Sequence, residues 1–424
     1  MIMIKFLWKG LLRDRHRSLF PVITTSIGVM LVVFLSAWLP GVMDDSIRHN
    51  ANFSTGHVKV TTKGYWELQH QMPLDLAMDD AKQIISDLKE QFPDMEWTAR
   101  IRFGGLLDVA GEDGETIAQG PASAIALDLL GKDSKEIERF NIRQGLVQGR
   151  LPENPDEILL AEKLAIQLGV KPGDTVTLFG STMYGSMTFY NFTIAGLLSF
   201  GVSAMDRSTI ITPLEGARFA LDMAGGATEI LGYLPDMNFS REKARAVAEQ
   251  FNTGRGDDEF ALNMVTLMDQ SGLGELLEYM DGMLGFILFV FVFMMFIVLW
   301  NSGLIGAIRR YGEMGLRLAI GETKSHIYWT LILESAVIGI MGSILGTIIG
   351  LIISAYLQVY GINIGDIMQN STMLMSDTIR AKIMPESFYI GFLPGLFAPA
   401  LGSLVAGRGI YKRETASLFK ELEL

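Results

Sequence analysis

Five histidines and 47 acidic residues could bind a metal ion or perform acid–base chemistry in this chain of 424 residues. Three of the histidines, His49, His57 and His70, lie close together, but their spacings of 8 and 13 residues match no zinc-ligand pattern. The adjacent carboxylates Asp79-Asp80 and Asp257-Asp258 are best explained as hydrated surface charges. We therefore expect no metal site in this chain.

Motifs for catalysis or nucleotide binding are also missing from the sequence. It contains no G-x-x-x-x-G-K-[ST] phosphate loop, no G-x-S-x-G turn and no H-E-x-x-H pair. It has no cysteine, which excludes thiol chemistry and cysteine-based metal sites. We expect a chain that is not an enzyme and that holds no cofactor of its own.

The most informative stretch lies between Arg309 and Gly350. An uncharged apolar run of 26 residues, Met283 to Ile308, ends at the basic pair Arg309-Arg310. A short charged segment follows, and then a second apolar run in which glycines recur. This pattern predicts two membrane helices joined by a compact, positively charged loop. Helix-forming residues continue to Gly321, so we expect a short helix at the membrane surface.

Four apolar runs are long enough to span a bilayer, which takes about 20 residues of helix. The first is too long for a secretory signal peptide and is interpreted as an uncleaved anchor. Residues 1–18 separate apolar from basic side chains and predict an interfacial helix, with a simple flank of the first span as the alternative. The runs are Leu19–Leu39, Met283–Ile308, Ser335–Tyr360 and Phe388–Gly407.

Charge predicts the orientation of these spans. The segments before the first run, after the second and after the fourth hold 13 basic and 6 acidic residues, which places them and both termini in the cytoplasm. Residues 41–280 are then outside. They have a net charge of −16, whereas the rest of the chain has a net charge of +4.

At the loop and the helix after it, the chain resembles the FtsX-like permeases of ABC transporters. That family includes the macrolide exporter MacB, the lipoprotein-release permeases LolC and LolE, and FtsX itself. A basic or polar residue usually precedes the glutamate of the motif, and Gly312 stands there in this chain. The pattern appears as Tyr311-Gly312-Glu313-Met314-Gly315, Ala319-Ile320-Gly321, and Glu334 followed by Gly339, Gly342, Gly346 and Gly350.

The resemblance implies that the loop docks on a separate ABC-type ATPase, which would carry ATP and Mg²⁺. It also implies a multi-pass protein of the cell inner membrane. No binding of nucleic acid is expected. The residues expected to couple the loop to the ATPase are Arg310, Glu313, Met314, Gly315, Arg317, Ala319, Ile320 and Gly321.

Glu334 is the only ionisable side chain between Ile327 and Tyr360. An ionised group costs roughly 2.5–3.5 kcal/mol at the centre of a membrane helix and less near its edge. We expect Glu334 to pair with a basic residue of the loop; a carboxylate that simply reaches water is the alternative.

Small residues in the third and fourth spans bear on helix packing. The glycines at 339, 342, 346 and 350 allow close approach of another helix. We expect that helix to come from a second copy or a paralogue, with packing inside the chain as the alternative. Pro394 and Pro399 are expected to kink the fourth span.

The external segment is predicted to mix helices and strands, held by its own core since disulfides are impossible. Alternation predicts strands at His57–Thr62, Thr98–Val109 and Glu115–Ala124, with a hairpin turn at 111–114. Helical spacing predicts a helix at Leu76–Phe92. Residues Gly149–Leu178 predict a strand at Glu157–Leu160, a helix at Glu162–Leu168 and a strand at Thr175–Phe179, and they resemble the periplasmic domain of the same family.

The expected fold is a membrane α-helical protein with four transmembrane helices and a large mixed α+β extracytoplasmic domain between the first and second. The expected organisation is an interfacial helix at 1–18, a transmembrane helix at 19–39, the extracytoplasmic domain at 40–282, a transmembrane helix at 283–308, a cytoplasmic coupling loop at 309–326, a transmembrane helix at 327–360, an extracytoplasmic loop at 361–387, a transmembrane helix at 388–407 and a cytoplasmic tail at 408–424.

Three functions are compatible with this organisation. The first is the permease subunit of a transporter that extracts lipoproteins or similar amphiphiles. Its expected partner on the periplasmic side is a lipoprotein carrier. The second is a MacB-like efflux permease that works with an adaptor. The third is an FtsX-like regulator of cell-wall hydrolases. The large external segment disfavours the third, and the T-G-H-V-K-V strand after the first span resembles the lipoprotein-release branch. We favour the first.

Overall fold

The structure is a computed structural model that describes residues 15–111, 113–200, 203–270, 272–363 and 378–412. The chain divides into two compact units. The helical unit contains the described residues 15–44, 279–362 and 379–412, and the sheet unit contains residues 45–278 with 363 and 378. Each unit is described by itself.

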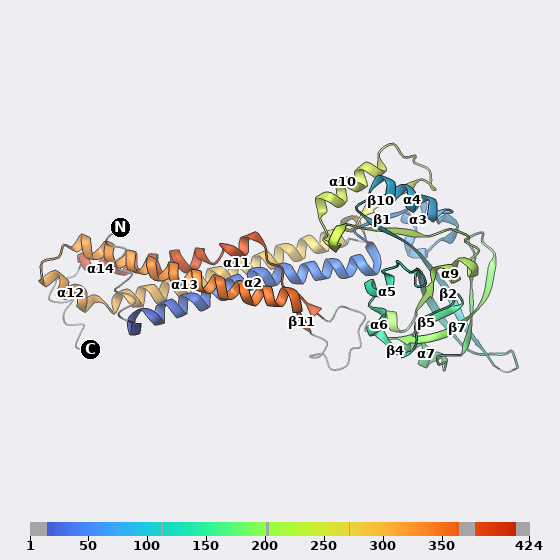
Figure 1. Cartoon of the computed structure of the whole chain (residues 1–424), viewed down its shortest axis with the longest axis horizontal. Helices are drawn as coiled ribbons and strands as arrows, with labels where there is room; N and C mark the ends of the chain where they lie inside the picture. The colour runs from blue at the N-terminus through green and yellow to red at the C-terminus, as the bar shows by residue number, and fades with distance from the viewer. Residues whose placement is uncertain (1–14, 112, 201–202, 271, 364–377, 413–424) are drawn as a thin grey trace. The chain divides into compact units, whose positions relative to one another are not determined.

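Four helices, in the ranges Leu19–Thr55, Leu273–Ile308, Lys324–Tyr360 and Pro385–Tyr411, are long and apolar enough to cross a membrane. Together with the mixed α and β domain between the first and second, they confirm the predicted fold class (Figure 1). The helical unit contains most of α2 (Arg15–Asn50) and most of α11 (Leu273–Ile308), together with α12 (Tyr311–Ala319), α13 (Lys324–Tyr360) and α14 (Ala398–Lys412).

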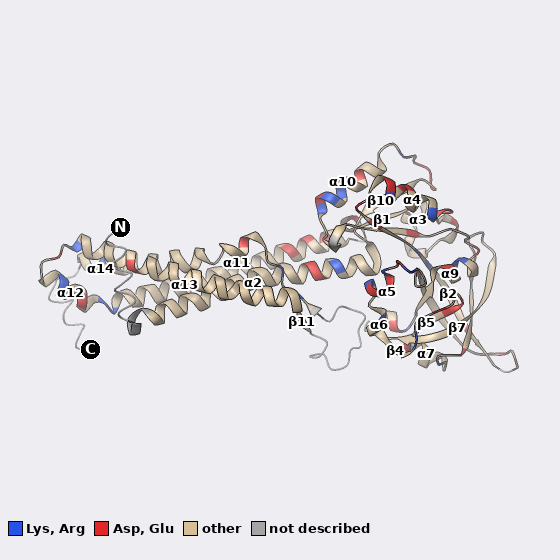
Figure 2. Cartoon of the chain, in the orientation of Figure 1, with Lys and Arg blue, Asp and Glu red and all other residues tan. Residues whose placement is uncertain are grey.

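The three long helices extend beyond the predicted spans. Helices α2 and α11 have 36 residues each and α13 has 37, so each is about 54 Å long, against about 30 Å of hydrocarbon. The expected domain limits at 40 and 283 therefore lie inside helices. Figure 2 shows that charged residues are sparse along the middle of these helices and gather around α12 and at the opposite ends of α2 and α11.

The ends of the predicted organisation fall partly outside the described residues. Residues 1–14 of the expected interfacial helix, 364–377 of the expected extracytoplasmic loop and 413–424 of the tail are not described. Within that loop the described elements are β11 (Ile362–Asn363), β12 (Thr378–Ile379) and the 3-10 turn Pro385–Phe388. A π-helical turn, Leu393–Phe397, contains Pro394 and interrupts the last span before α14.

Glycines bring α13 into close contact with α2 along a stripe. A Cβ atom at Gly346 would lie 2.4 Å from the carbonyl oxygen of Ser26, and one at Gly342 would lie 2.6 Å from Cβ of Thr25. Gly350 faces Val33 in the same way, and Gly339 lies against Gly395. These faces are thus covered within the chain. The expectation that a second copy or a paralogue supplies the helix that packs on these four glycines is therefore corrected to packing inside the chain. Small side chains leave room for backbone-to-backbone packing.

Alanine at position 346 tests this contact. Alanine is the better helix former, yet its methyl group would overlap the α2 backbone, and overpacking costs about 1–3 kcal/mol. We expect Gly346→Ala to lower the melting temperature of the full chain in detergent. Gly285→Ala is the matched control, because a Cβ at Gly285 of α11 meets nothing within 4 Å. Equal melting temperatures for the two variants would contradict the close approach.

The sheet unit is built on ten strands in the order β10-β1-β9-β2-β3-β8-β5-β7-β4, with β6 paired to both β2 and β7. Because β6 joins β2 to β7, the pairings from β2 through β3, β8, β5 and β7 return to β2 and close a circuit. The strands are β1 (Val58–Thr62), β2 (Glu96–Ala110), β3 (Thr116–Leu127), β4 (Leu146–Gly149), β5 (Glu157–Ala161), β6 (Thr175–Ser181), β7 (Met187–Leu198), β8 (Thr209–Pro213), β9 (Glu229–Tyr233) and β10 (Leu262–Thr266).

Helices cover this sheet with their apolar faces. Asp80 caps α4 by accepting a hydrogen bond from the backbone N–H of Gln83, and Ser240 caps α10 in the same way. Gly169, with φ of +70°, ends α7 in the left-handed conformation that favours glycine. The helices are α3 (Lys63–Glu67), α4 (Ala81–Gln91), α5 (Glu136–Arg139), α6 (Ile142–Gly145), α7 (Glu162–Leu168), α8 (Ser203–Asp206), α9 (Leu214–Ala220) and α10 (Arg241–Asn252).

The predicted strands and helices of this domain correspond to β1, α4, β2, β3, β5, α7 and β6. Helix α7 has the predicted limits, while α4 begins at Ala81, five residues later than predicted, because a 3-10 turn at Leu74–Leu76 precedes it. The sequence pattern did not indicate how β6 closes the circuit, since that depends on pairing between distant segments.

Candidate functional site

Helix α12 is held against α13 and α14 by one apolar face. Tyr311 and Met314 are buried in a cluster with Ala307, Ile327, Leu331, Ala406 and Ile410. The Tyr311 hydroxyl donates a hydrogen bond of 2.6 Å to the carbonyl oxygen of Ala406. These contacts fix the short helix to the helical unit, and the spacing of Tyr311, Met314 and Leu318 is the signal in the sequence that could have identified the face.

An ion pair joins the start of α12 to the third span. The Arg310 guanidinium contacts the Glu334 carboxylate, and the two side chains are only 20% and 25% exposed. The structure thus places beside Glu334 a basic residue from the loop. A partly desolvated pair of this kind stabilises the charge that Glu334 carries inside an otherwise apolar helix.

The opposite face of α12 is exposed and apolar. Leu316 and Ile320 are 51% and 77% exposed. Gly321, with φ of +104°, follows, and nothing lies within 4 Å of the position of its Cβ. The next turn is closed by a 2.7 Å ion pair between Arg317 and Glu322.

The residues proposed for coupling fall into two groups. Met314 and Gly315 are buried toward the helical unit, whereas Ala319, Ile320 and Gly321 are exposed. Arg310 and Arg317 are in ion pairs, and Glu313 is half-buried and has an interaction partner. Sequence reasoning did not single out Tyr311 as an anchor or Leu316 as part of the exposed face. The surface available to a partner is therefore formed by fewer residues than the eight that were expected to couple the loop to the ATPase.

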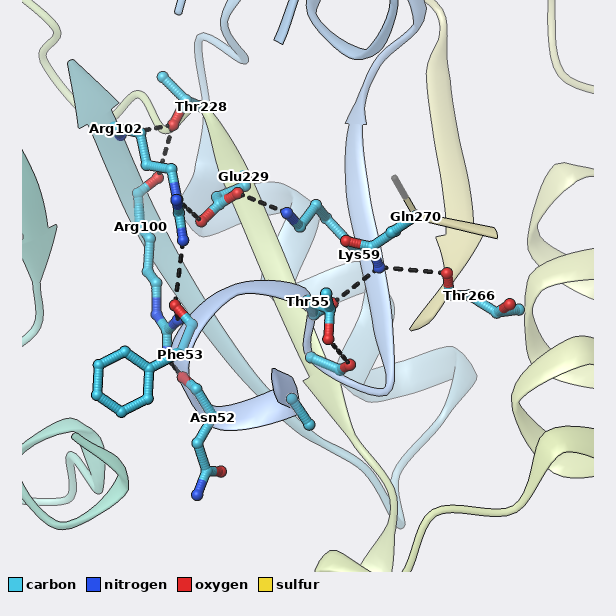
Figure 3. Close-up of polar contacts among 12 residues, drawn as sticks. Asn52, Phe53, Thr55, Lys59, Arg100, Arg102, Thr228, Glu229, Thr266 and Gln270 are labelled. Atoms are coloured by element: carbon cyan, nitrogen blue, oxygen red, sulfur yellow. Dashed lines mark hydrogen bonds and ion pairs between the residues drawn. The ribbon is translucent and has the colours of Figure 1, made fainter. Parts of the chain in front are cut away.

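A second polar cluster lies in the sheet unit, where the helical stretch that includes α2 ends (Figure 3). We call it the helix-end cluster. The π-helical turn Ala51–Thr55 continues α2 and stops at Gly56, whose φ is +60°. The last carbonyl groups of a helix have no partner within it. The cluster consists of Lys59, Arg100, Arg102, Glu136, Glu229, Tyr233 and Gln270.

Side chains from three distant segments donate hydrogen bonds to these carbonyl groups. Arg100, fully buried, donates from its guanidinium to the carbonyl oxygens of Asn52 at 2.8 Å and Phe53 at 3.2 Å. Arg102 donates to the Phe53 oxygen at 3.1 Å. The Tyr233 hydroxyl donates to Ala51, and the Gln270 amide donates to Thr55 at 3.1 Å. Cations at this end also interact favourably with the helix dipole.

Carboxylates balance the buried cations. Glu136 accepts from Arg100 at 2.8 Å and from Arg139 at 3.0 Å. Glu229 pairs with Lys59 and with Arg102, each at 2.9 Å. Every charge in the cluster therefore has a partner, as buried charges require.

These neighbours shift the ionisation of the cluster. Burial raises the pKa of Glu229, but the nearby charges of Lys59, Arg102 and Arg100 outweigh burial and lower that pKa to about 2. Burial raises the pKa of Tyr233 to about 12. Glu229 is accordingly ionised, and Tyr233 neutral, throughout the ordinary range of pH.

The histidines do not form a site in the structure. His57 is buried, and its Nδ1 accepts a hydrogen bond of 2.9 Å from the backbone N–H of Leu234. Within the described residues no group of three or more His, Cys, Asp or Glu is arranged to hold a metal ion. The expected lack of metals and cofactors stays a prediction.

Two family models match the chain. Residues 285–415 match the FtsX-like permease C-terminal model, and residues 18–249, more than half of the chain, match the MacB-like periplasmic core domain. The chain belongs to the FtsX/MacB-like family of ABC-transporter permeases. The predicted family is therefore confirmed, and this permease carries both the membrane part and the periplasmic type of domain.

Among solved structures, the permease is similar to the periplasmic region of MacB from Actinobacillus actinomycetemcomitans. The identity is 13%, the TM-score is 0.36, and the match covers 53% of this chain and 95% of that chain. No curated protein matches the permease. The family assignment rests on the two family models.

Acid should weaken the sheet unit through Glu229. Its pKa is about 2 in the folded permease and about 4.5 ordinarily, so the unfolded chain binds the proton first as the pH falls. The stabilisation by Glu229 is complete above pH 4.5 and is lost between about pH 4.5 and 2. We expect the protection factors for amide hydrogen exchange in β1 and β9 to fall across that window in the full chain.

The variant Glu229→Gln isolates this contribution. It leaves the buried Lys59 and the partly exposed Arg102 without this countercharge; an unpaired buried charge such as that of Lys59 costs about 3–5 kcal/mol, so exchange in β9 should be faster already at pH 7. Glu278→Gln is the control, because its pair with Arg241 is exposed and worth about 1 kcal/mol or less. Similar exchange in both variants would show that the buried pairs do not hold the sheet together.

Proposed function

We propose that this permease is the transmembrane subunit of an ABC transporter of the mechanotransmission type, driven by an ATPase on a separate chain. The observation that carries the proposal is the two-faced helix α12. One face is anchored by Tyr311 and Met314, and the other exposes Leu316 and Ile320. An apolar helix face that projects from a membrane protein is suited to insertion into a groove of a soluble partner.

The anchoring contacts support a mechanical role for α12. Because Arg310 is paired with Glu334 and Tyr311 is bonded to Ala406, a displacement of α12 acts directly on α13 and α14. A loop without such contacts would absorb the displacement instead. In this proposal α12 and both chain termini face the cytoplasm of the inner membrane, as the distribution of basic residues suggests.

The helix-end cluster supports the second half of the mechanism. The end of the stretch that includes α2 is bonded through its carbonyl groups to β2, β9 and Gln270. Force that reaches the end of this helix is therefore delivered to the sheet rather than lost in a loose connection. We propose that the extracytoplasmic domain handles the substrate as this force moves it.

The proposed substrates are lipoproteins or similar amphiphiles taken from the outer leaflet. The four apolar runs contain no Asp, Glu, Lys or Arg, and Glu334, which directly precedes the third run, is paired with Arg310. A polar solute would need polar groups along its route, because hydrocarbon walls exclude water. A second permease copy or a paralogue and a periplasmic lipoprotein carrier are the proposed partners. A MacB-like efflux permease with an adaptor, or an FtsX-like regulator of hydrolases, is the alternative.

Changing Ile320 tests the docking of α12. Burial of an isoleucine contributes about 1.5–3 kcal/mol, so Ile320→Glu should weaken binding of the ATPase by at least about tenfold. Stimulated ATP hydrolysis should fall with it. Ile166→Glu is the matched control, since Ile166 is a helical isoleucine of the sheet unit with 72% exposure. Undiminished binding and hydrolysis with Ile320→Glu would refute the docking role.

The substrate class is tested with proteoliposomes that contain the permease and its co-purifying ATPase. We expect ATP to release an acylated lipoprotein into solution and to leave a small hydrophilic solute in place. The same lipoprotein without its acyl chains is the control for recognition of the lipid part. ATP-driven movement of the hydrophilic solute, with the lipoprotein retained, would contradict the proposal. Identification of an adaptor or a hydrolase as the co-purifying partner would favour an alternative.

A further inference from the structure

Helix α11 differs from the other spans in how little of it is covered. In its most apolar stretch 6% of the residues are buried, against 39% in each of the other three spans. Its described surface exposes Phe, Met, Ile and Val side chains, such as Phe289, Phe293 and Ile297. A helix packed this loosely leaves space beside it that the surrounding bilayer must fill.

One such space is a cavity of about 570 Å³ within the helical unit. It lies between the part of α2 around Phe20–Thr25, the last turns of α11 from Val298 with the turn Arg309-Arg310 after it, and the part of α13 from Leu331 to Ile338. This volume falls within the range of about 300–1,000 Å³ that small-molecule pockets occupy. Most of the lining is apolar, with Phe20, Val298 and Leu331 among the walls.

Charge is concentrated at one end of the cavity, where Arg309 and Arg310 belong to its lining. Arg310 is committed to Glu334. Arg309 is exposed, and its side chain has no ion pair or hydrogen bond within the described part of the chain. Asn301 also lines the cavity, and its amide has no hydrogen-bond partner among those residues. Among the described residues, Arg309 therefore offers an uncompensated cation at this end of the cavity, and Asn301 offers an amide about 12 Å farther along α11, beside apolar walls.

We propose that this cavity binds one anionic phospholipid, whose phosphate lies against Arg309 and whose acyl chain lies along α11. The assignment goes beyond the transport role, since it concerns the lipid that supports the helical unit rather than the substrate. Basic pockets between membrane helices select anionic head groups, and apolar walls select a chain over water. A bound lipid would link the position of α11 to the turn that leads into α12.

Two substitutions test the charge. The full chain is reconstituted in nanodiscs of mixed phosphatidylglycerol and phosphatidylcholine and is then extracted in mild detergent. Native mass spectrometry identifies the lipids that remain bound. The unmodified chain should retain phosphatidylglycerol in preference to phosphatidylcholine. Arg309→Gln should lower the ratio of the two by about fivefold, the effect of one basic residue near a membrane surface. Arg408→Gln, an exposed arginine of α14 that does not line the cavity, should leave the ratio near its unmodified value.

Two further substitutions test the location. A Cβ at Gly306, which lines the cavity, meets nothing within 4 Å, so Gly306→Leu adds a side chain at the lining with no clash at its Cβ. It should remove the retained lipid. Gly285→Leu is the control, because Gly285 also lies on α11 and has open space, but it is outside the lining.

The remaining outcomes separate a lipid from a simple anion. Inorganic phosphate in the buffer should not displace phosphatidylglycerol, and displacement would mean that the cavity binds a phosphate ion instead. Equal retention of phosphatidylcholine and phosphatidylglycerol by the unmodified chain would overturn the selection by charge. Equal effects of Arg309→Gln and Arg408→Gln, or full retention in Gly306→Leu, would overturn the assignment to this cavity.

Discussion

The need to satisfy the last carbonyl groups of a long helix is the constraint on which the sheet unit depends. Asn52, Phe53 and Thr55 present carbonyl oxygens where the stretch that includes α2 ends, and burial would make each unpaired oxygen costly; the Ala51 oxygen also accepts from the backbone N–H of Gly56. Donors on β2, on β9 and just before α11 meet this need. Since two of the donors are arginines, carboxylates must follow them into the interior, and the helix-end cluster results.

The same constraint explains why the cluster is so rich in charge. A neutral donor would satisfy one carbonyl group, whereas the fork of Arg100 reaches two carbonyl oxygens, Glu136 and Tyr233 at once. Arginine also remains protonated when buried. The result is a connection with directional bonds on several sides of the helix end.

In the helical unit a different constraint operates, because lipid provides no hydrophobic drive for helices to associate. Helices α2 and α13 associate through glycines that let the backbones touch. Helix α11 makes such glycine contacts with α14, at Gly303 against Pro399 and at Trp300 against Gly402, but most of its apolar stretch is exposed. This contrast accounts for both the tight stripe at Gly342 and Gly346 and the cavity beside α11.

The sequence by itself determined the features that depend on local chemistry. Apolar length predicted four spans, the motif at Arg309–Gly350 predicted the family, and residue spacing predicted α7 and most of the strands up to β6. Each of these is encoded in neighbouring residues, where hydrophobic periodicity and turn chemistry act.

Tertiary structure decided which residues meet. Arg100 and Arg102 share one face of β2 and were not singled out, since their partners Glu136 and Glu229 lie 36 and 127 residues away in the sequence. The partner of the glycine stripe was assigned to a second copy because spacing shows that a helix can approach and not which one. Glu334 was expected to meet a loop cation, but only the fold selects Arg310. Contacts between distant segments depend on how the whole chain folds, and a pattern in neighbouring residues does not determine which distant residues will meet.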